Sequence, residues 1–232
     1  MIAAHFSQNI MRGRIDVIAS DLQIRHVHHL LAVAMLLATP LPAPASPPCT
    51  EPHYRWSEKT DASLAGKPMH DVDVSDILAK WKARTITKAD KCAARFGREK
   101  GVYRVTGWVR RIKLRETDQD WHIELTENED DTPVSATCII VEIPAPSFGD
   151  LYAQARAQLA SFVDTLSLKS NGDLDQPVQL RFTGAAFFDG YHQGTSEGGG
   201  APHASGHGRC NSSVRALWEI HPVYKVEAPE EP

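Results

Sequence analysis

From Gly101 onward, apolar residues alternate with polar ones as they do in β-strands, and one amphipathic helix interrupts this alternation. The strand-like segments are residues 102–114, 120–126, 134–144, 178–190 and 213–226, and the helix is expected over residues 145–166. Three strands, a helix and two strands is the order of an OB-fold, a five-stranded Greek-key barrel. The expected fold class is therefore mainly β with helices, and an α+β sandwich of the same elements is the alternative.

Three residues are expected to disturb these strands. Gly107 and Gly184 lie inside long strand-like segments, where a glycine permits a bulge or a sharp bend. Pro222 is expected to end regular pairing in the last segment, because proline has no backbone N–H to donate.

The chain before Gly101 lacks strand-like alternation. Residues 46–70 are rich in proline, serine and threonine, and we expect them to form an extended linker. Apolar residues at helical spacing predict a helix over residues 73–84, and a second, shorter helix is expected over residues 89–96. These helices would pack on the barrel.

An apolar run of ten residues, Leu30 to Thr39, precedes the linker. It is too short to span a bilayer, which takes about 20 apolar residues. Ala43 and Ala45 follow at the spacing of a signal-peptidase site, so we expect a secretory signal peptide that is cleaved after Ala45. Its leader is unusually long, so translation is expected to start downstream of Met1. The expected division is a signal peptide at 1–45, a linker at 46–70, a helical segment at 71–98, the OB-like barrel at 99–227 and a disordered tail at 228–232.

All four cysteines follow the expected cleavage point. An even number of cysteines in an exported chain favours disulfides, and we expect a periplasmic or extracellular protein. Cys138 lies inside a strand-like segment and is the most constrained; its partner would be Cys92 or Cys210, and Cys49 would take a remaining partner. No two cysteines have the C-x-x-C spacing of a zinc knuckle.

The formal net charge of −4 at pH 7 argues against a protein that binds polyanions in general, because such proteins usually carry an excess of basic residues. The first strand nevertheless carries a basic and aromatic face, Arg104, Trp108 and Arg110, and these residue types bind single-stranded nucleic acid. Acidic residues follow on the turn at 127–131 and can neutralise this face. A solvated charged face is therefore the alternative interpretation.

Five segments of the chain, VYRVTGWV, DWHIEL, VEIPAP, FTGAAFFDGYH and WEIHPV, resemble an uncharacterised group of exported bacterial OB-fold-like proteins with a terminal E-I-H-P-V strand. The resemblance covers about residues 99–226, with the motifs in the same order. It implies an OB-like fold and an exported location, and it implies no activity. The long loop after His192, rich in glycine and histidine, departs from the group, where a shorter turn is usual.

The same segments supply the candidate ligand or metal residues. They are His122, Glu124, Glu142, Asp189, His192, Glu219 and His221. Closure of five strands into a barrel would bring these imidazoles and carboxylates near one rim. Such ligands suit Zn²⁺, Mn²⁺ or Fe²⁺, and a metal with an open position can activate water.

A structural role is the alternative for these residues. His122 and His221 can hydrogen-bond carboxylates and close one end of the barrel, while Glu124 and Glu219 lie on a solvated face. The loop after His192 is expected to be a flexible insertion, although its histidines could bind a metal adventitiously.

Two functions fit these observations. The first is a non-enzymatic binding module for a protein, glycan or oligonucleotide partner, with no firmly expected cofactor. The second is a metal-dependent hydrolase or nuclease that uses the histidine and acid cluster and a divalent metal. No compact H-E-x-x-H spacing is present, and the sequence alone favours the first.

Overall fold

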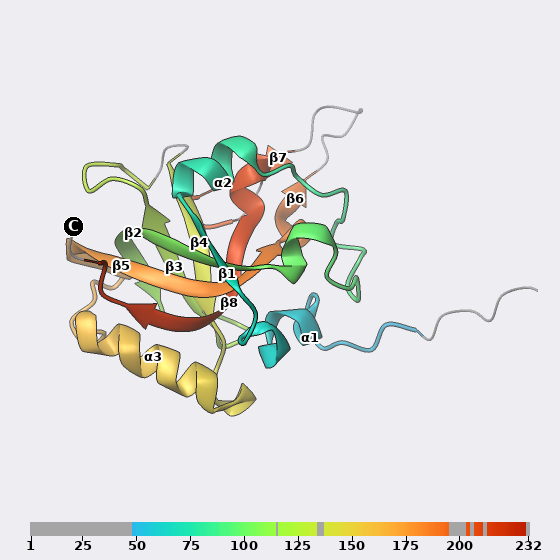
Figure 1. Ribbon diagram of the computed structural model, residues 1–232, viewed down its shortest axis with the longest axis horizontal. Coiled ribbons are helices and arrows are strands. Elements are labelled where there is room, and N and C mark those ends of the chain that lie inside the picture. Colours follow the sequence, from blue (N-terminus) through green and yellow to red (C-terminus); the bar gives the residue numbers. More distant parts are fainter. Residues whose placement is uncertain are drawn as a thin grey trace, which may run out of the picture. The chain divides into compact units, whose positions relative to one another are not determined.

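The structure is a computed structural model, and it describes residues 48–114, 116–133, 137–194, 203–204, 207–210 and 213–230 (Figure 1). The strands are β1 (Met69–Val72), β2 (Val102–Lys113), β3 (Trp121–Thr126), β4 (Cys138–Ile143), β5 (Asp173–Phe188), β6 (Gln193–Gly194), β7 (His203–Ala204) and β8 (Trp218–Glu227). The α-helices are α1 (Trp56–Lys59), α2 (Val74–Lys80) and α3 (Asp150–Phe162). The 3-10 helices are η1 (Ala62–Leu64), η2 (Gly97–Lys100), η3 (Pro146–Phe148), η4 (Gly190–His192) and η5 (Val214–Leu217).

Six strands form one mixed sheet whose pairings run in a ring. The order is β1-β2-β3-β4-β8-β5, and β5 also pairs with β2. The pairing of β4 with β8 is parallel, as is that of β1 with β2, and the other pairings are antiparallel. One hydrophobic core lies against the sheet and includes the fully buried Val109, Ile123, Val141, Phe182 and Ile220.

The expected class, mainly β with helices, is confirmed, but the sheet is ring-like and is not a clear five-stranded OB barrel. Strand β1 is a sixth member that the sequence pattern did not predict, because its four residues are mostly exposed and do not alternate. Strands β4 and β8 share only two residue pairs, Ile140 with Glu219 and Val141 with Ile220, so the ring is weakly joined there.

Gly184 disturbs its strand as expected, whereas Gly107 and Pro222 act differently from expectation. The register of β2 shifts between Val109 and Arg111 and not at Gly107. Gly107 instead permits close packing, because a Cβ there would lie 2.7 Å from Cγ of Leu125. Gly184 does lie at a register shift, opposite the region of β8 that contains Pro222. Strand β8 does not end at this proline, which follows a cis peptide bond, and continues to Glu227.

Helix α3 is the helix expected between the third and fourth strand-like segments. It packs beside β8 in Figure 1 and buries Tyr152, Ala155 and Leu159. It begins after Gly149, and no side chain caps it, because the residue at the cap position is a glycine.

The segment before β2 is more structured than an extended linker. It contains α1 and η1 and buries the side chains of Tyr54 and Arg55. Arg55 donates a hydrogen bond of 2.6 Å to the buried carboxylate of Glu99 in η2 and another of 3.1 Å to the backbone carbonyl of Phe188 in β5, which holds this segment against the sheet. The linker interpretation is therefore wrong for the part of 46–70 that the structure describes.

The helix predicted at residues 73–84 is present as α2, but the one predicted at 89–96 is not. That stretch is irregular because the side chain of Arg95 turns inward. Its guanidinium donates to the backbone carbonyls of Ala186 and His221, at 2.5 and 2.9 Å.

Two disulfides link distant parts of the chain. Cys49 is bonded to Cys92, and Cys138 is bonded to Cys210, which decides between the partners that the sequence left open for Cys138. Two disulfides are typical of a chain that matures in an oxidising compartment.

The expected signal peptide lies outside the described residues, as do residues 231–232 of the expected tail. Glu230, in the described part of that tail, pairs with Arg181. Among the residues that the structure describes, no helix has the length and apolar character needed to cross a membrane.

Candidate functional site

Five of the seven candidate side chains meet beside one cavity. His122 and Glu142 are directly paired residues on β3 and β4. Asp189 and His192 follow β5, and Glu219 lies on β8. The cavity has a volume of about 450 Å³, and all five side chains line it. The sheet therefore brings residues that are almost a hundred positions apart to one place.

One group of these side chains runs from the cavity wall into the interior. Nδ1 of His122 lies 2.7 Å from Oε1 of Glu142, and the other Glu142 oxygen lies 2.9 Å from Nδ1 of His221. Nε2 of His221 lies 3.1 Å from Oδ2 of Asp120. All four side chains are buried. Asp120, His122, Glu142 and His221 are called the closed half of the cluster below.

A second group faces the cavity. Nδ1 of His192 lies 2.5 Å from Oδ2 of Asp189, and Nε2 of His207 lies 3.9 Å from the same oxygen. Nε2 of His207 also lies 2.7 Å from Oε1 of Glu219. Asp189, His192, His207 and Glu219 all line the cavity and are called the open half. The two halves touch where the other Glu219 oxygen lies 3.3 Å from Nδ1 of His221.

Lys59 adds a buried positive charge to this cluster. Its Nζ lies 3.8 Å from Oε2 of Glu142 and 3.4 Å from Oδ2 of Asp118. Helix α1 supplies this lysine from the segment expected to be a linker, so the sequence pattern did not single it out. The cation offsets part of the negative charge that the carboxylates place in the interior.

The closed half is held as a set of opposite charges. Burial alone raises the pKa of Glu142, but Lys59 and His221 outweigh burial and hold the pKa well below its usual value. Burial lowers the pKa of His221, but the carboxylates of Glu142 and Asp120 outweigh it and raise the pKa well above its usual value. Burial also raises the pKa of Asp120, and its contact with His221 offsets this only in part. The imidazolium of His221 therefore lies between two carboxylates.

In the open half, as in the closed half, neighbouring charges lower the pKa of a carboxyl group and raise the pKa of an imidazole. Burial raises the pKa of Asp189, but the hydrogen bond from His192 and the charge of Lys59 lower it to about 2. Burial lowers the pKa of His207, but the carboxylate of Glu219 outweighs burial and raises it to about 9. In the metal-free protein, His207 therefore carries a proton at neutral pH that a bound metal would displace.

Among the described residues, two sets of three have ligand atoms close enough to hold a metal ion. The ligand atoms of Asp189, His192 and His207 lie within 4.8 Å of one another, as do those of Asp120, Glu142 and His221. The first set borders the cavity, which leaves room for water or a substrate. Of the second set, only Glu142 lines the cavity, and its charges already compensate one another. The first set is therefore the better metal site.

His122 leaves one buried polar atom unpaired beside this first set. Its Nδ1 is engaged by Glu142, whereas Nε2 has no hydrogen-bond partner among the described residues. The ring lines the cavity, and its centroid lies 6.4 Å from that of His207. A buried nitrogen without a partner is costly, so this atom marks a place for a ligand, a metal or a water.

Glu124, another candidate, does not join the cluster. Its buried carboxylate accepts from Arg111 at 3.1 Å and from Nε of Arg209 at 2.6 Å. The expectation that Glu124 and Glu219 lie on a solvated face is wrong, because both side chains are buried. The signal for Glu124 as a ligand was its position two residues after His122, but the two side chains have different partners: Glu142 for His122 and arginines for Glu124.

The basic and aromatic face of β2 also lies apart from the cavity. Arg104 forms a two-bond ion pair with Asp71 of the neighbouring strand, and Arg110 donates to the backbone carbonyl of Glu129. Trp108 is partly exposed, and none of the three lines the cavity. The contact from the turn at 127–131 is made by a backbone carbonyl and not by an acidic side chain, and the carboxylate that pairs with Arg104 comes from β1 instead.

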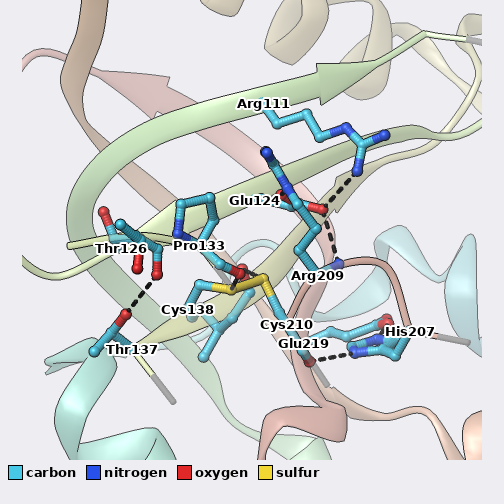
Figure 2. The surroundings of a disulfide bond; sticks show 12 residues. Arg111, Glu124, Thr126, Pro133, Thr137, Cys138, His207, Arg209, Cys210 and Glu219 are labelled. Atoms are coloured by element: carbon cyan, nitrogen blue, oxygen red, sulfur yellow. Dashed lines mark hydrogen bonds and ion pairs between the residues drawn. A yellow bond between two sulfur atoms is a disulfide. The ribbon is translucent and has the colours of Figure 1, made fainter. Parts of the chain in front are cut away.

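The second disulfide lies next to the open half. Figure 2 shows the Cys138–Cys210 bond between the Arg111–Glu124–Arg209 group and the His207–Glu219 pair. The bond joins β4 to the segment that contributes His207.

Three members of the cluster were missed or undervalued in the sequence. Asp120 precedes a strand, Lys59 lies in a segment without periodicity, and His207 lies in a glycine-rich loop. Only His207 gave a signal, because it is a histidine in a long loop that ends in a cysteine.

Comparison of the chain with protein-family models, with curated proteins and with solved structures finds no match.

Proposed function

We propose that this protein is an exported, metal-dependent hydrolase that holds a divalent cation at Asp189, His192 and His207. The observation that carries the proposal is that these three side chains, from two separate parts of the chain, place ligand atoms within 4.8 Å of one another beside an open cavity. The sequence alone favoured a binding module because it contains no compact H-E-x-x-H spacing.

The chemistry of the three ligands supports this role. Two imidazoles and a carboxylate suit Zn²⁺, Mn²⁺ or Fe²⁺. Three protein ligands leave a position for water, and a bound cation lowers the pKa of that water so that it becomes a nucleophile at neutral pH. The cavity of about 450 Å³ lies in the size range of small-molecule sites.

We also propose that the ring of strands is an elaborated OB-like barrel and that the chain belongs with the exported bacterial OB-fold-like group it resembles. The ring order β2, β3, β4, β8, β5 and the position of α3 between β4 and β5 support this. The two disulfides and the apolar leader support export by a signal peptide.

An anion-binding module is the second candidate, and one observation favours it. Three lysines outside the buried cluster, Lys88, Lys91 and Lys113, line the cavity. Lys113 pairs with Glu116, whereas Lys88 lies over the ring of Tyr191. These cations would attract an anionic ligand whether or not it is hydrolysed.

The test is metal content and turnover of the mature, disulfide-bonded chain. We expect about one Zn²⁺ or Mn²⁺ per chain by mass spectrometry of metals, and metal-dependent hydrolysis in a panel of ester and phosphoester substrates. The His192→Ala variant is expected to lose both the bound metal and the hydrolysis. The control, His70→Ala, changes an exposed histidine on β1 and is expected to keep both the metal and the hydrolysis. Purified protein that binds neither Zn²⁺ nor Mn²⁺ at micromolar concentration would overturn the proposal; bound metal without turnover would favour the binding module.

A further inference from the structure

The third proposed ligand, His207, differs from the other two in how it is held. Asp189 and His192 follow directly from the long strand β5. His207 begins a short described segment, residues 207–210, that belongs to no strand or helix. Something other than strand pairing must therefore keep its imidazole beside Asp189.

The ring of His207 is oriented by the backbone of Cys210. Nδ1 of His207 lies 3.2 Å from the carbonyl oxygen of Cys210, which leaves Nε2 directed toward Asp189 and Glu219. Histidines that bind metals commonly donate the other ring N–H to a carbonyl or carboxylate, and this contact fixes both the tautomer and the orientation of the ring. The Cys210 carbonyl occupies that role here.

Cys210 in turn is fixed by its bond to β4. Its sulfur is bonded to Cys138, and both cysteines are fully buried. Beside them, the backbone N–H of Arg209 donates to Oε1 of Glu124 at 3.1 Å, and its guanidinium contacts Oε2 at 2.6 Å. Figure 2 shows the disulfide and this ion pair side by side, at the two adjacent residues Arg209 and Cys210 that follow His207 and Gly208.

Gly208 lets this turn lie directly against the cluster. Its φ is +55°, a conformation that favours glycine. A Cβ added there would lie 3.0 Å from Oε1 of Glu124 and 3.1 Å from Nε2 of His122. The turn therefore passes close to the unpaired nitrogen of His122, and a larger residue there would have to shift either these side chains or the turn.

We propose that the Cys138–Cys210 disulfide positions His207 as a metal ligand, so that the affinity of the site for its cation depends on this bond. The proposal rests on the proposed function, because it requires the cation at Asp189, His192 and His207. A disulfide that served stability alone could lie anywhere in the sheet; this one ends three residues from a ligand and supplies the carbonyl that orients it.

The protein contains its own matched control. The Cys49–Cys92 disulfide spans 43 residues, and the Cys138–Cys210 disulfide spans 72. Loop-closure entropy grows only slowly with loop length, so removal of either bond relaxes the unfolded chain to a similar extent. Only one of the two bonds is attached to a proposed ligand.

The experiment measures Zn²⁺ affinity of the full mature chain, with Co²⁺ absorption as a report on coordination geometry. The variants are Cys138→Ser with Cys210→Ser, Cys49→Ser with Cys92→Ser, and His207→Ala. Loss of an orienting contact weakens metal binding by about 10–100-fold, and we expect this loss for the first pair and for His207→Ala. The Cys49→Ser and Cys92→Ser pair is expected to keep the wild-type affinity and Co²⁺ spectrum.

A combined variant separates positioning from stability. If the disulfide acts through His207, then adding Cys138→Ser and Cys210→Ser to His207→Ala should weaken Zn²⁺ binding little further, because both changes remove the same interaction. Fully additive losses would show that the disulfide acts elsewhere and would overturn the inference.

Gly208→Ala keeps the test decisive if the cysteine variants do not fold. It leaves both disulfides intact and displaces the turn from His122, so we expect weaker Zn²⁺ binding and an altered Co²⁺ spectrum. Wild-type affinity in Gly208→Ala, or in a folded Cys138→Ser and Cys210→Ser pair, contradicts the positioning role. Failure of the wild-type protein itself to bind Zn²⁺ or Co²⁺ is a different result, because it contradicts the proposed function and not only this inference.

Discussion

The closed and open halves of the cluster use the same residue types for different purposes. In the closed half, Glu142 contacts His122 and His221 at 2.7 and 2.9 Å, so each charge has a buried partner. In the open half, Asp189 and His192 face a cavity, and His192 is partly exposed. Paired buried charges are costly to disrupt, whereas groups at a cavity can exchange partners. We therefore expect the closed half to contribute mainly to stability and the open half mainly to the proposed ligand binding.

The largest effect is expected for Glu142→Gln in the closed half. Loss of this carboxylate removes a buried partner of both His221 and Lys59, so the free energy of unfolding should fall by about 3 kcal/mol. Urea denaturation measures this change. Glu116→Gln, in a partly exposed pair with Lys113, is the control and should cost less than about 1 kcal/mol. An equal loss of unfolding free energy in the two variants would contradict the structural role assigned to the closed half.

The closed half should also make stability depend on pH through His221. Its pKa is raised in the folded state, so its contribution is complete below the unfolded value of about 6.5 and is lost as the pH rises through the folded pKa. Glu142 has the opposite shift, so its contribution is present above about 4.3 and is lost as the pH falls. We expect His221→Gln to cost about 3 kcal/mol at pH 6 and progressively less at alkaline pH. A cost in denaturation experiments that grows from pH 6 to pH 10 would reverse the assigned sign.

A substitution in the open half should change ligand binding more than stability. His192→Ala removes a partly exposed ring whose only described ion pair is with Asp189, so the free energy of unfolding should change by about 1 kcal/mol. Zn²⁺ affinity should fall by at least about tenfold, as titration calorimetry can measure. A loss of stability as large as that of Glu142→Gln would show that the open half is structural as well.

The smallest effect is expected at the mouth of the cavity. Lys88 is exposed, so Lys88→Ala should alter the free energy of unfolding by less than about 0.5 kcal/mol. Binding of inorganic phosphate should weaken by a few-fold, and the difference should shrink with added salt because exposed charges are screened. Lys169→Ala, an exposed lysine paired with Asp175, is the matched control and should leave phosphate binding unchanged.

The sequence predicted the parts of the molecule that have a regular pattern. The alternation around His122 and Glu142 located β3 and β4, and the helical spacing before Leu159 located α3. It could not predict β1, because an exposed edge strand needs no apolar face. Arg95 explains the missing helix at 89–96, since a buried guanidinium that binds distant carbonyls leaves no trace in local periodicity.

The candidate site was predictable to the extent that its residues lie on strands. Asp189, His192 and Glu219 were found because they flank recognisable strands. Lys59 and His207 were not predicted as members of the cluster, because their positions depend on contacts made across the fold and on a disulfide. Glu124 shows the reverse failure: its residue type fitted a ligand, but Arg111 and Arg209 satisfy its charge.

The short join between β4 and β8 has a consequence for how this scaffold can change. Glu219 lies in one of the two residue pairs that connect these strands, and Glu142 and His221 lie just beyond them. The contact of 2.9 Å between Glu142 on β4 and His221 on β8 crosses the same join, so side-chain charges as well as backbone pairing close the ring there. Conditions that break this contact should therefore open the sheet between β4 and β8 before they affect its longer pairings.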